Sequence, residues 1–429
     1  MAQYNKQNNS FLANGTSLFE VVMLADAEGN INSGGGNFSG TAVDAFGRAR
    51  MSQPLTIFDS NNVGRADDKF AVKYTGGGSS TYDTDGHFIS LYVSNPGDSV
   101  IHRSKRRGVY QPGKSLLAMA SFAFNPLVAG LTQKVGYYDN QDGIYFELNE
   151  DGQMYIVLRD GTNGGGSFVE TRVAQSNWNG DKLNGVAGDS TSGFILDPAM
   201  TNIFFTDIEW LGVGSVRVGF VINGQLIVCH TFHNANNGKT KPYMASANLP
   251  ITYEISTTTG EVGGLRVLCS TIISEGGYEA IGLQRTIGTS LAGNSTNTAN
   301  TFVNLVSIKL NDPKDIVVLS SIDILNIANA DFEWGLFRNA TVPGATYASA
   351  EGSVLYDTID ADITSLGKRI AGGYLGGKTA PVSLGELNWD YQLGTDVDLV
   401  SDTFTLAVRT ATTSKAAAGL LKWFDFTSN

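Results

Sequence analysis

The stretch NIFFTDIEWLGVGSVRVGFVINGQLIVCHTFHNAN, residues 202–236, decides the fold class of this chain. Its β-branched and aromatic residues recur with the period of two that is typical of a strand with one buried face. Asn223-Gly224 separates two such runs, and an Asn-Gly dipeptide in this position is the strongest short-range signal for a two-residue hairpin. The stretch therefore predicts antiparallel β-structure.

The length of the turn also predicts the register of this hairpin. A two-residue turn places Val221 opposite Leu226. Farther from the turn, the same register pairs Phe220 with Ile227, Val218 with Cys229 and Arg217 with His230. Cys229 is then expected in the core, where a thiol acts as a small hydrophobic group.

The carboxylates and histidines of this stretch are the first candidates for chemistry. Asp207 and Glu209 share one face of their strand, and residues at i and i+2 meet the ~5–9.5 Å separation of paired glycosidase carboxylates, as any polar sheet face does. His230 and His233 are three residues apart and point to opposite faces, whereas zinc needs about four converging ligands. A glycan hydrolase stays an open hypothesis, and a metal site is not expected.

Composition agrees with a β-rich chain and excludes some partners. The 429 residues include 51 glycines, well above the ~7% of an average chain, and only 16% are charged. The net charge of −12 argues against binding to nucleic acid or to an anionic membrane. No apolar run approaches the ~18 residues that span a bilayer, and the N-terminus lacks the basic start and apolar region of a signal peptide. Cys229 and Cys269 lie in apolar runs, both are expected to be buried, and no disulfide is expected.

Turn signals divide the chain into three parts. Residues 1–50 are rich in Gly, Asn and Ser and are expected to form an extended docking arm. Residues 51–288 read as a procession of strands, and the polar stretch 289–301 is the best boundary before a second β-rich region at 302–429. The predicted fold class is all-β: an antiparallel β-sandwich or jelly-roll core, a second β-sandwich and an extended N-terminal arm.

One basic cluster and one acidic loop are further candidates. Arg103, Lys105, Arg106 and Arg107 could bind a phosphate or another subunit, although such a cluster is more often a solvated loop or subunit contact. The acidic loop around residues 139–147 has the residues of a Ca²⁺ loop but not the spacing of an EF-hand, so a tight hairpin is the simpler interpretation.

A tryptophan loop completes the set of candidate contacts. Trp178, Asn179 and Asp181 could contact a glycan or a partner protein, and the alternative is that Trp178 is a core residue. The sequence contains no GxSxG, GxxxxGK[ST], HExxH or dinucleotide-binding glycine motif. We therefore assign no catalytic residue, no cofactor-binding residue, no metal ligand and no cofactor.

Several segments taken together resemble a family of tailed-bacteriophage virion structural proteins. The resemblance covers roughly residues 18–280, and none of its motifs is a chemical one. The segments are DAFGRARMSQPLTIFDS (44–60), YQPGKSLLAMASF (110–122), VGYYDNQDGIYFEL (135–148), WNGDKLNG (178–185), IEWLGVGSVRVGFVINGQ (208–225), NLPITYEI (248–255) and CSTIISEGGY (269–278).

The resemblance implies a virion component of β-sandwich type, such as a head decoration, a head fibre or a tail-associated protein, without catalytic residues. We therefore predict a non-enzymatic protein on the particle exterior, assembled in the host cytoplasm and attached through its N-terminal region. The expected partners are capsid, portal or tail subunits and further copies of the chain, for instance in a trimer. The alternative is a receptor-binding, lectin-like tail fibre or spike module that recognises host-surface glycans.

Overall fold

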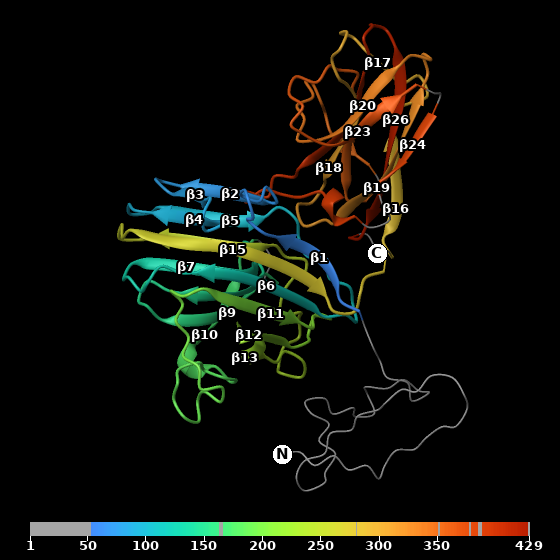
Figure 1. The fold of residues 1–429 in the computed structure, drawn as a ribbon. Coiled ribbons are helices and arrows are strands. Elements are labelled where there is room, and N and C mark those ends of the chain that lie inside the picture. Colours follow the sequence, from blue (N-terminus) through green and yellow to red (C-terminus); the bar gives the residue numbers. More distant parts are fainter. Residues whose placement is uncertain are drawn as a thin grey trace, which may run out of the picture. The chain divides into compact units, whose positions relative to one another are not determined.

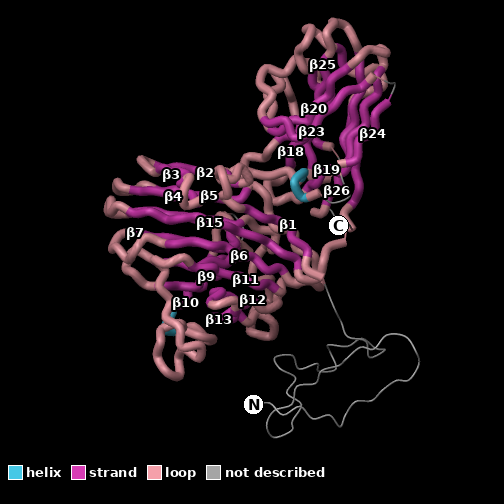
Figure 2. Tube along the Cα trace, viewed as in Figure 1, coloured by secondary structure: helices cyan, strands magenta, loops and turns pink. Residues whose placement is uncertain are grey.

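The computed structural model describes residues 53–162, 166–279, 281–350, 352–376, 379–384 and 388–427. The expected docking arm, residues 1–50, lies outside the described residues. Within them, the chain folds into antiparallel strands and two short 3₁₀ turns, η2 (Gln175–Asn177) and η3 (Trp389–Tyr391) (Figures 1 and 2). The all-β fold class predicted from the period of two is confirmed. No membrane-spanning helix occurs in this part of the chain.

The first sandwich consists of an eight-stranded and a seven-stranded sheet. In the larger sheet the order is β13-β12-β11-β6-β15-β4-β3, with β1 also paired to β15. Its strands are β1 (Leu55–Ser60), β3 (Ser79–Asp83), β4 (Phe88–Val93), β6 (Leu116–Ala123), β11 (Asn202–Ile208), β12 (Val216–Ile222), β13 (Gln225–Phe232) and β15 (Gly263–Ser274). Strands from both ends of the first sandwich's sequence therefore meet in one sheet.

The seven-stranded sheet has the order β10-β9-β8-β7-β14-β5-β2. Its strands are β2 (Phe70–Thr75), β5 (Ser99–Ser104), β7 (Leu131–Tyr138), β8 (Gly143–Leu148), β9 (Met154–Asp160), β10 (Val169–Ala174) and β14 (Ile251–Thr257). The chain passes repeatedly from one sheet to the other, as in a jelly roll.

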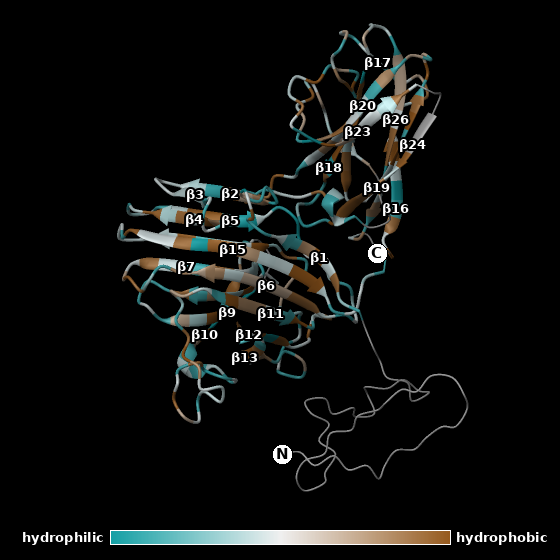
Figure 3. Ribbon diagram, viewed as in Figure 1, coloured by the Kyte–Doolittle hydropathy of each residue, from teal (hydrophilic) through white to brown (hydrophobic). Residues whose placement is uncertain are grey.

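Aromatic rings fill the space between these two sheets. Phe146 on β8 lies 6.0 Å from Phe122, 6.0 Å from Phe204 and 5.1 Å from Phe220, measured between ring centroids. These three partners come from the opposite sheet, and all four rings are buried. Figure 3 shows hydrophobic residues, in brown, along the strands and hydrophilic residues, in teal, in many of the turns.

The hairpin β12–β13 forms around Asn223-Gly224, and its first pairs are as predicted. Val221 pairs with Leu226, but a bulge between Val218 and Gly219 shifts the register farther from the turn. Val218 therefore pairs with His230, and Arg217 pairs with Thr231, which corrects the two predicted pairs. Cys229 is buried as expected, whereas Cys269 is exposed and the expectation that it is buried is wrong.

The second sandwich has a five-stranded and a six-stranded sheet. The five-stranded sheet has the order β16-β26-β19-β24, with β17 also paired to β26. Its strands are β16 (Leu283–Gly288), β17 (Asn294–Ser295), β19 (Val317–Asn326), β24 (Thr379–Ser383) and β26 (Ala416–Asp425). The six-stranded sheet has the order β21-β22-β18-β25-β20-β23. Its strands are β18 (Val303–Leu310), β20 (Phe332–Arg338), β21 (Ala348–Ser349), β22 (Val354–Asp357), β23 (Lys368–Leu375) and β25 (Thr403–Arg409).

The second sandwich begins earlier in the sequence than predicted. β16 pairs with β26, so residues 283–288 belong to the second sandwich and not to the first. The polar stretch that served as the predicted boundary also belongs to this sandwich, because β17 pairs with β26 and the Asn294 side chain donates to the carbonyl oxygen of Asn304 at 2.7 Å. A buried asparagine compensates its polarity by hydrogen bonding, so polarity alone did not mark a linker here.

Candidate functional site

The arginines of the basic cluster are buried and bind protein partners. Arg107 Nη1 lies 2.8 Å from Asp139 Oδ2, and Arg106 Nη1 lies 2.8 Å from Asp390 Oδ1. Burial raises the pKa of the Asp139 carboxyl. The positive charge of Arg107 and the hydrogen bonds that the carboxylate accepts nevertheless hold that pKa below its usual value. Arg103 is buried as well. The structure thereby corrects both the phosphate contact and the solvated loop considered for these arginines, because their guanidinium groups are buried and bound to protein groups.

The same segment also contacts other parts of the chain through its backbone and its side chains. The carbonyl oxygen of Lys105 accepts a hydrogen bond from the Thr395 backbone N–H at 2.9 Å. Arg103 Nη1 donates to the carbonyl oxygen of Val397 at 3.4 Å. The Lys105 ammonium donates to the carbonyl oxygen of Asp68 at 3.0 Å. The cluster therefore contributes to packing within the chain.

The tryptophan loop closes the edge of the larger sheet. Trp178 is only 2% exposed, and its Nε1 donates to the Val173 carbonyl oxygen at 3.1 Å. The Asn179 side chain accepts from the backbone N–H of Thr231 at 2.8 Å and donates to its carbonyl oxygen at 2.9 Å, as another strand would. A buried ring cannot stack on a sugar, so the structure corrects the glycan contact considered for Trp178 in favour of the core position.

Asp181, the third residue of that loop, is bound by four local donors. Burial raises the pKa of its carboxyl, but the backbone N–H groups of Leu183 and Ser192 and the Ser190 hydroxyl lower it to about 2. The Thr191 hydroxyl donates to the same carboxylate at 3.1 Å. This carboxylate organises a loop, and its oxygen atoms accept hydrogen bonds from that loop and not from a ligand.

The carboxylates of the acidic loop are likewise engaged by protein groups. Asp142 Oδ1 accepts from the backbone N–H of Gly161 at 2.9 Å and of Ala245 at 2.8 Å. Glu147 lies on β8 and forms an ion pair with Arg172. Across the described ranges, no group of three His, Cys, Asp or Glu side chains could hold a metal ion. The tight-hairpin interpretation describes this loop.

The opening stretch forms the wall of the sandwich. Asp207 pairs with Arg217 across β11 and β12, while Glu209 lies beyond the end of β11 and is exposed. His230 is buried, and burial followed by the nearby His233 lowers its pKa to about 4. At neutral pH His230 is therefore uncharged, and Asp207 is engaged by a guanidinium group.

The outer face of the seven-stranded sheet carries a closed network that sequence reasoning missed. Tyr145 is fully buried, and its hydroxyl donates to Glu170 Oε1 at 2.6 Å. Arg159 donates to the same oxygen at 2.8 Å, and its guanidinium carbon lies 5.2 Å from the Tyr145 ring centroid and 4.4 Å from that of Phe168. Burial raises the pKa of Glu170, but the hydrogen bonds from Tyr145 and Arg159 hold it below its usual value. We call this set the closed face.

The second sandwich carries a row of side chains that, unlike the closed face, leaves a tyrosine exposed. Tyr374 on β23 is paired with Glu333 on β20, which is paired with Arg409 on β25, so the three lie side by side across neighbouring strands. The Arg409 Nε donates to Glu333 Oε2 at 2.7 Å, and Arg369 donates to the other oxygen. Burial raises the pKa of Glu333, but these two guanidinium groups hold it below its usual value.

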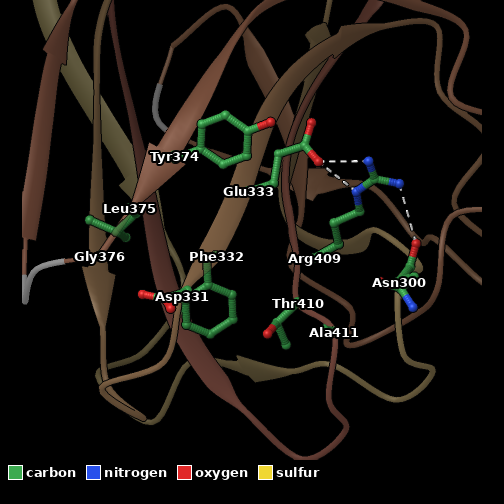
Figure 4. A pocket seen from close by; sticks show the side chains of 10 residues that line it. All are labelled: Asn300, Asp331, Phe332, Glu333, Tyr374, Leu375, Gly376, Arg409, Thr410 and Ala411. Carbon is green, nitrogen blue, oxygen red and sulfur yellow. Dashed lines mark hydrogen bonds and ion pairs between the residues drawn. The ribbon is translucent and has the colours of Figure 1, made fainter.

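A hollow of about 500 Å³ lies beside this row (Figure 4). Tyr374 is 86% exposed there, and Phe332 and Leu375 are buried at the wall. The lining consists of Asn300, Asp331, Phe332, Glu333, Tyr374, Leu375, Gly376, Arg409, Thr410 and Ala411. We call this the Tyr374 pocket.

Two glycines allow the arrangement next to the pocket. A Cβ atom on Gly372 would collide with the Arg369 guanidinium, and one on Gly335 would lie 2.5 Å from the Phe337 ring. Arg369 therefore crosses bare backbone to reach Glu333, and it also donates to the Trp334 carbonyl oxygen at 2.7 Å. In sequence, the pocket residues are scattered over more than a hundred positions, and a tyrosine in the glycine-rich run GGYLGG is the one signal that could have singled out this edge.

No protein-family model matches the sequence, and no curated protein matches it either. Among solved structures, a glycosyl hydrolase family protein from Mycobacterium fortuitum is similar with 12% identity and a TM-score of 0.35, over 51% of this chain and 99% of that one. A glycosyl hydrolase family 16 protein from Mycobacterium smegmatis has 10% identity and a TM-score of 0.34, over 51% and 100%.

A lectin-like defence protein, arcelin-5 from Phaseolus vulgaris, is also similar, with 9% identity and a TM-score of 0.31 over 53% of this chain and 100% of that one. Enzymes and lectin-like proteins thus both occur among these structures. At such identities and scores, they do not decide what this chain does.

Proposed function

We propose that this chain is a non-enzymatic structural protein on the exterior of a tailed-bacteriophage particle, attached through its N-terminal region. The observation that carries the proposal is the place of the segments that resemble phage virion proteins. Where described, they lie in the framework of the first sandwich: residues 135–148 form most of the β7–β8 hairpin, and residues 248–255 lead into and form most of β14. The resemblance therefore concerns a scaffold.

These framework segments are joined to one another by buried hydrogen bonds. The Tyr137 hydroxyl donates to the Ala247 carbonyl oxygen at 2.7 Å and accepts from the Leu249 backbone N–H at 3.0 Å. Tyr110 stacks edge-on against Trp210 at 5.5 Å. Packing residues of this kind suit a structural protein that binds capsid, portal or tail subunits and further copies of itself.

The chemistry of the ionisable groups also supports a role without catalysis. Asp207 and Glu147 are held in ion pairs, and burial raises the pKa of the Cys229 thiol far above neutral. A group that is clamped or kept protonated in this way is a poor general base or nucleophile. These ion pairs stabilise the first sandwich and leave their carboxylates without a catalytic role.

The test is cryo-electron microscopy of intact particles that carry this chain, with and without residues 1–50. We expect density for both sandwiches on the outside of the wild-type particle and none after the deletion. The full-length Tyr374→Ala variant is the matched control and should be incorporated normally. Density inside the head, or unchanged incorporation of the deletion variant, would overturn the proposal. Sedimentation that shows a strict monomer, both free and released from particles, would overturn self-association.

A further inference from the structure

We propose that the Tyr374 pocket binds an uncharged saccharide. In this arrangement the tyrosine ring packs against the flat C–H face of a sugar ring, and polar side chains of the pocket bind its hydroxyl groups. The biological use of such a site, recognition of a surface glycan, rests on the proposed display at the particle exterior. Binding itself is a property of the chain and can be measured without any particle.

The ring of Tyr374 is exposed to solvent. A large aromatic side chain normally buries most of its surface, and exposed tyrosines are enriched where a surface recognises a partner. Tyr374 is 86% exposed on β23, which is an edge strand of its sheet. Gly373 directly precedes Tyr374 and Gly376 follows it by two positions, so little side-chain bulk adjoins the ring along its own strand.

Polar side chains line the same hollow (Figure 4). Asp331 is exposed and forms no ion pair with the described residues, so its carboxylate can accept hydrogen bonds from two neighbouring hydroxyls. The Asn300 side chain both donates and accepts, and Thr410 contributes a hydroxyl. Alternating donors and acceptors beside an apolar face are what the rim of a sugar ring requires.

The charged groups around the pocket balance one another, which disfavours ionic ligands. Arg369 and Arg409 share the single carboxylate of Glu333, and the exposed Asp331 supplies a second carboxylate. Two guanidinium groups therefore face two carboxylates, and no net charge attracts a phosphate or an acidic sugar. A quaternary ammonium ion is commonly held in an aromatic cage, whereas Tyr374 is the single exposed ring here.

The volume agrees with a small ligand. About 500 Å³ falls within the ~300–1,000 Å³ of small-molecule sites. Phe332 and Leu375 supply apolar wall, and the side chains already held in place by Glu333 need no reorganisation on binding. A pocket of this kind matches one part of a longer glycan chain.

The test uses the purified full-length chain on an array of neutral and acidic oligosaccharides, followed by calorimetric titration of the strongest neutral oligosaccharide. Tyr374→Ala should weaken that binding about tenfold or more, as truncation of an aromatic anchor does. Tyr374→Phe keeps the ring and should remain within about threefold of wild type. Asp331→Ala should also weaken binding about tenfold.

Tyr92→Ala is the matched control, because Tyr92 is an exposed tyrosine on β4 of the first sandwich. It should leave the affinity unchanged, and the melting curves of all four variants should match that of wild type. The proposal fails if no neutral oligosaccharide binds, if acidic ones bind better, or if Tyr374→Ala binds as wild type does. A negative array with normal particle incorporation overturns the site alone, and a positive array with failed incorporation overturns the structural role alone.

Discussion

The closed face of the first sandwich and the Tyr374 pocket of the second use the same residue types with opposite results. On the closed face, Tyr145 is buried beneath Arg159 and its hydroxyl is bound to Glu170. In the pocket, Glu333 is bound by two arginines, and Tyr374 beside it remains exposed. The difference teaches that an arginine–carboxylate–tyrosine set becomes a stabilising network where other groups cover it, and a recognition surface where they do not.

The largest effect should come from breaking a buried ion pair in the first sandwich. Arg107→Ala leaves the Asp139 carboxylate buried without its partner, and such a loss costs about 3–5 kcal/mol of unfolding free energy. Urea unfolding followed by circular dichroism measures it. Lys422→Ala, which breaks the half-exposed pair with Asp323 in the second sandwich, should cost about 1 kcal/mol or less. Equal losses in the two variants would contradict the contrast between buried and open ionic groups.

An intermediate effect is expected from acid. The pKa of Asp181 is about 2 in the folded chain and 3.8 as a free side chain, so the folded state binds the proton less tightly. The stability it contributes is therefore complete above about pH 4 and is lost as the pH falls towards 2. Asp181→Asn should flatten that part of the curve of unfolding free energy against pH. An unchanged curve would assign the acid sensitivity to other carboxylates.

A smaller effect should follow from removing one hydroxyl of the closed face. Tyr145→Phe deletes the donor to Glu170 but leaves the ion pair with Arg159, so we expect a loss of about 1 kcal/mol. Tyr74→Phe is the control, because the Tyr74 hydroxyl bonds to Ser80 at an exposed position. A loss above about 3 kcal/mol for Tyr145→Phe would mean that the whole network depends on this hydroxyl.

The smallest effect on stability is expected in the pocket. Tyr374→Ala removes an exposed ring and should change the unfolding free energy by no more than about 0.5 kcal/mol. The same urea titration measures it. A loss comparable to that of Arg107→Ala would show that the ring supports the sheet, and the contrast between the two regions would disappear.

Sequence patterns predicted the secondary structure because strands and turns are local. The period of two and the Asn223-Gly224 signal led to the β12–β13 hairpin, and the Gly-rich turns led to antiparallel sandwiches. The bulge beyond Val218 could not be predicted in this way. At the bulge, the backbone carbonyl oxygens of residues 228 and 229 accept hydrogen bonds from the loop that follows Trp178, some fifty positions away in the sequence.

Candidate sites were harder to predict, because the fate of a charged residue is set by its partners in space. Arg107 and Asp139 are 32 positions apart in sequence yet form one buried pair. Glu333 and Arg409, 76 positions apart, meet because their strands are neighbours in one sheet. A sequence pattern records residue types but not such distances.

The sequence by itself determined the all-β class and the turn of the β12–β13 hairpin, since these follow from local periodicity and turn residues. Only the tertiary structure decided that the basic cluster and Trp178 are buried, that β16 belongs to the second sandwich, and that Tyr374 lies open beside Glu333. The physical reason is that burial, ion pairing and cross-strand neighbours arise from long-range sheet pairing, which joins residues far apart along the chain.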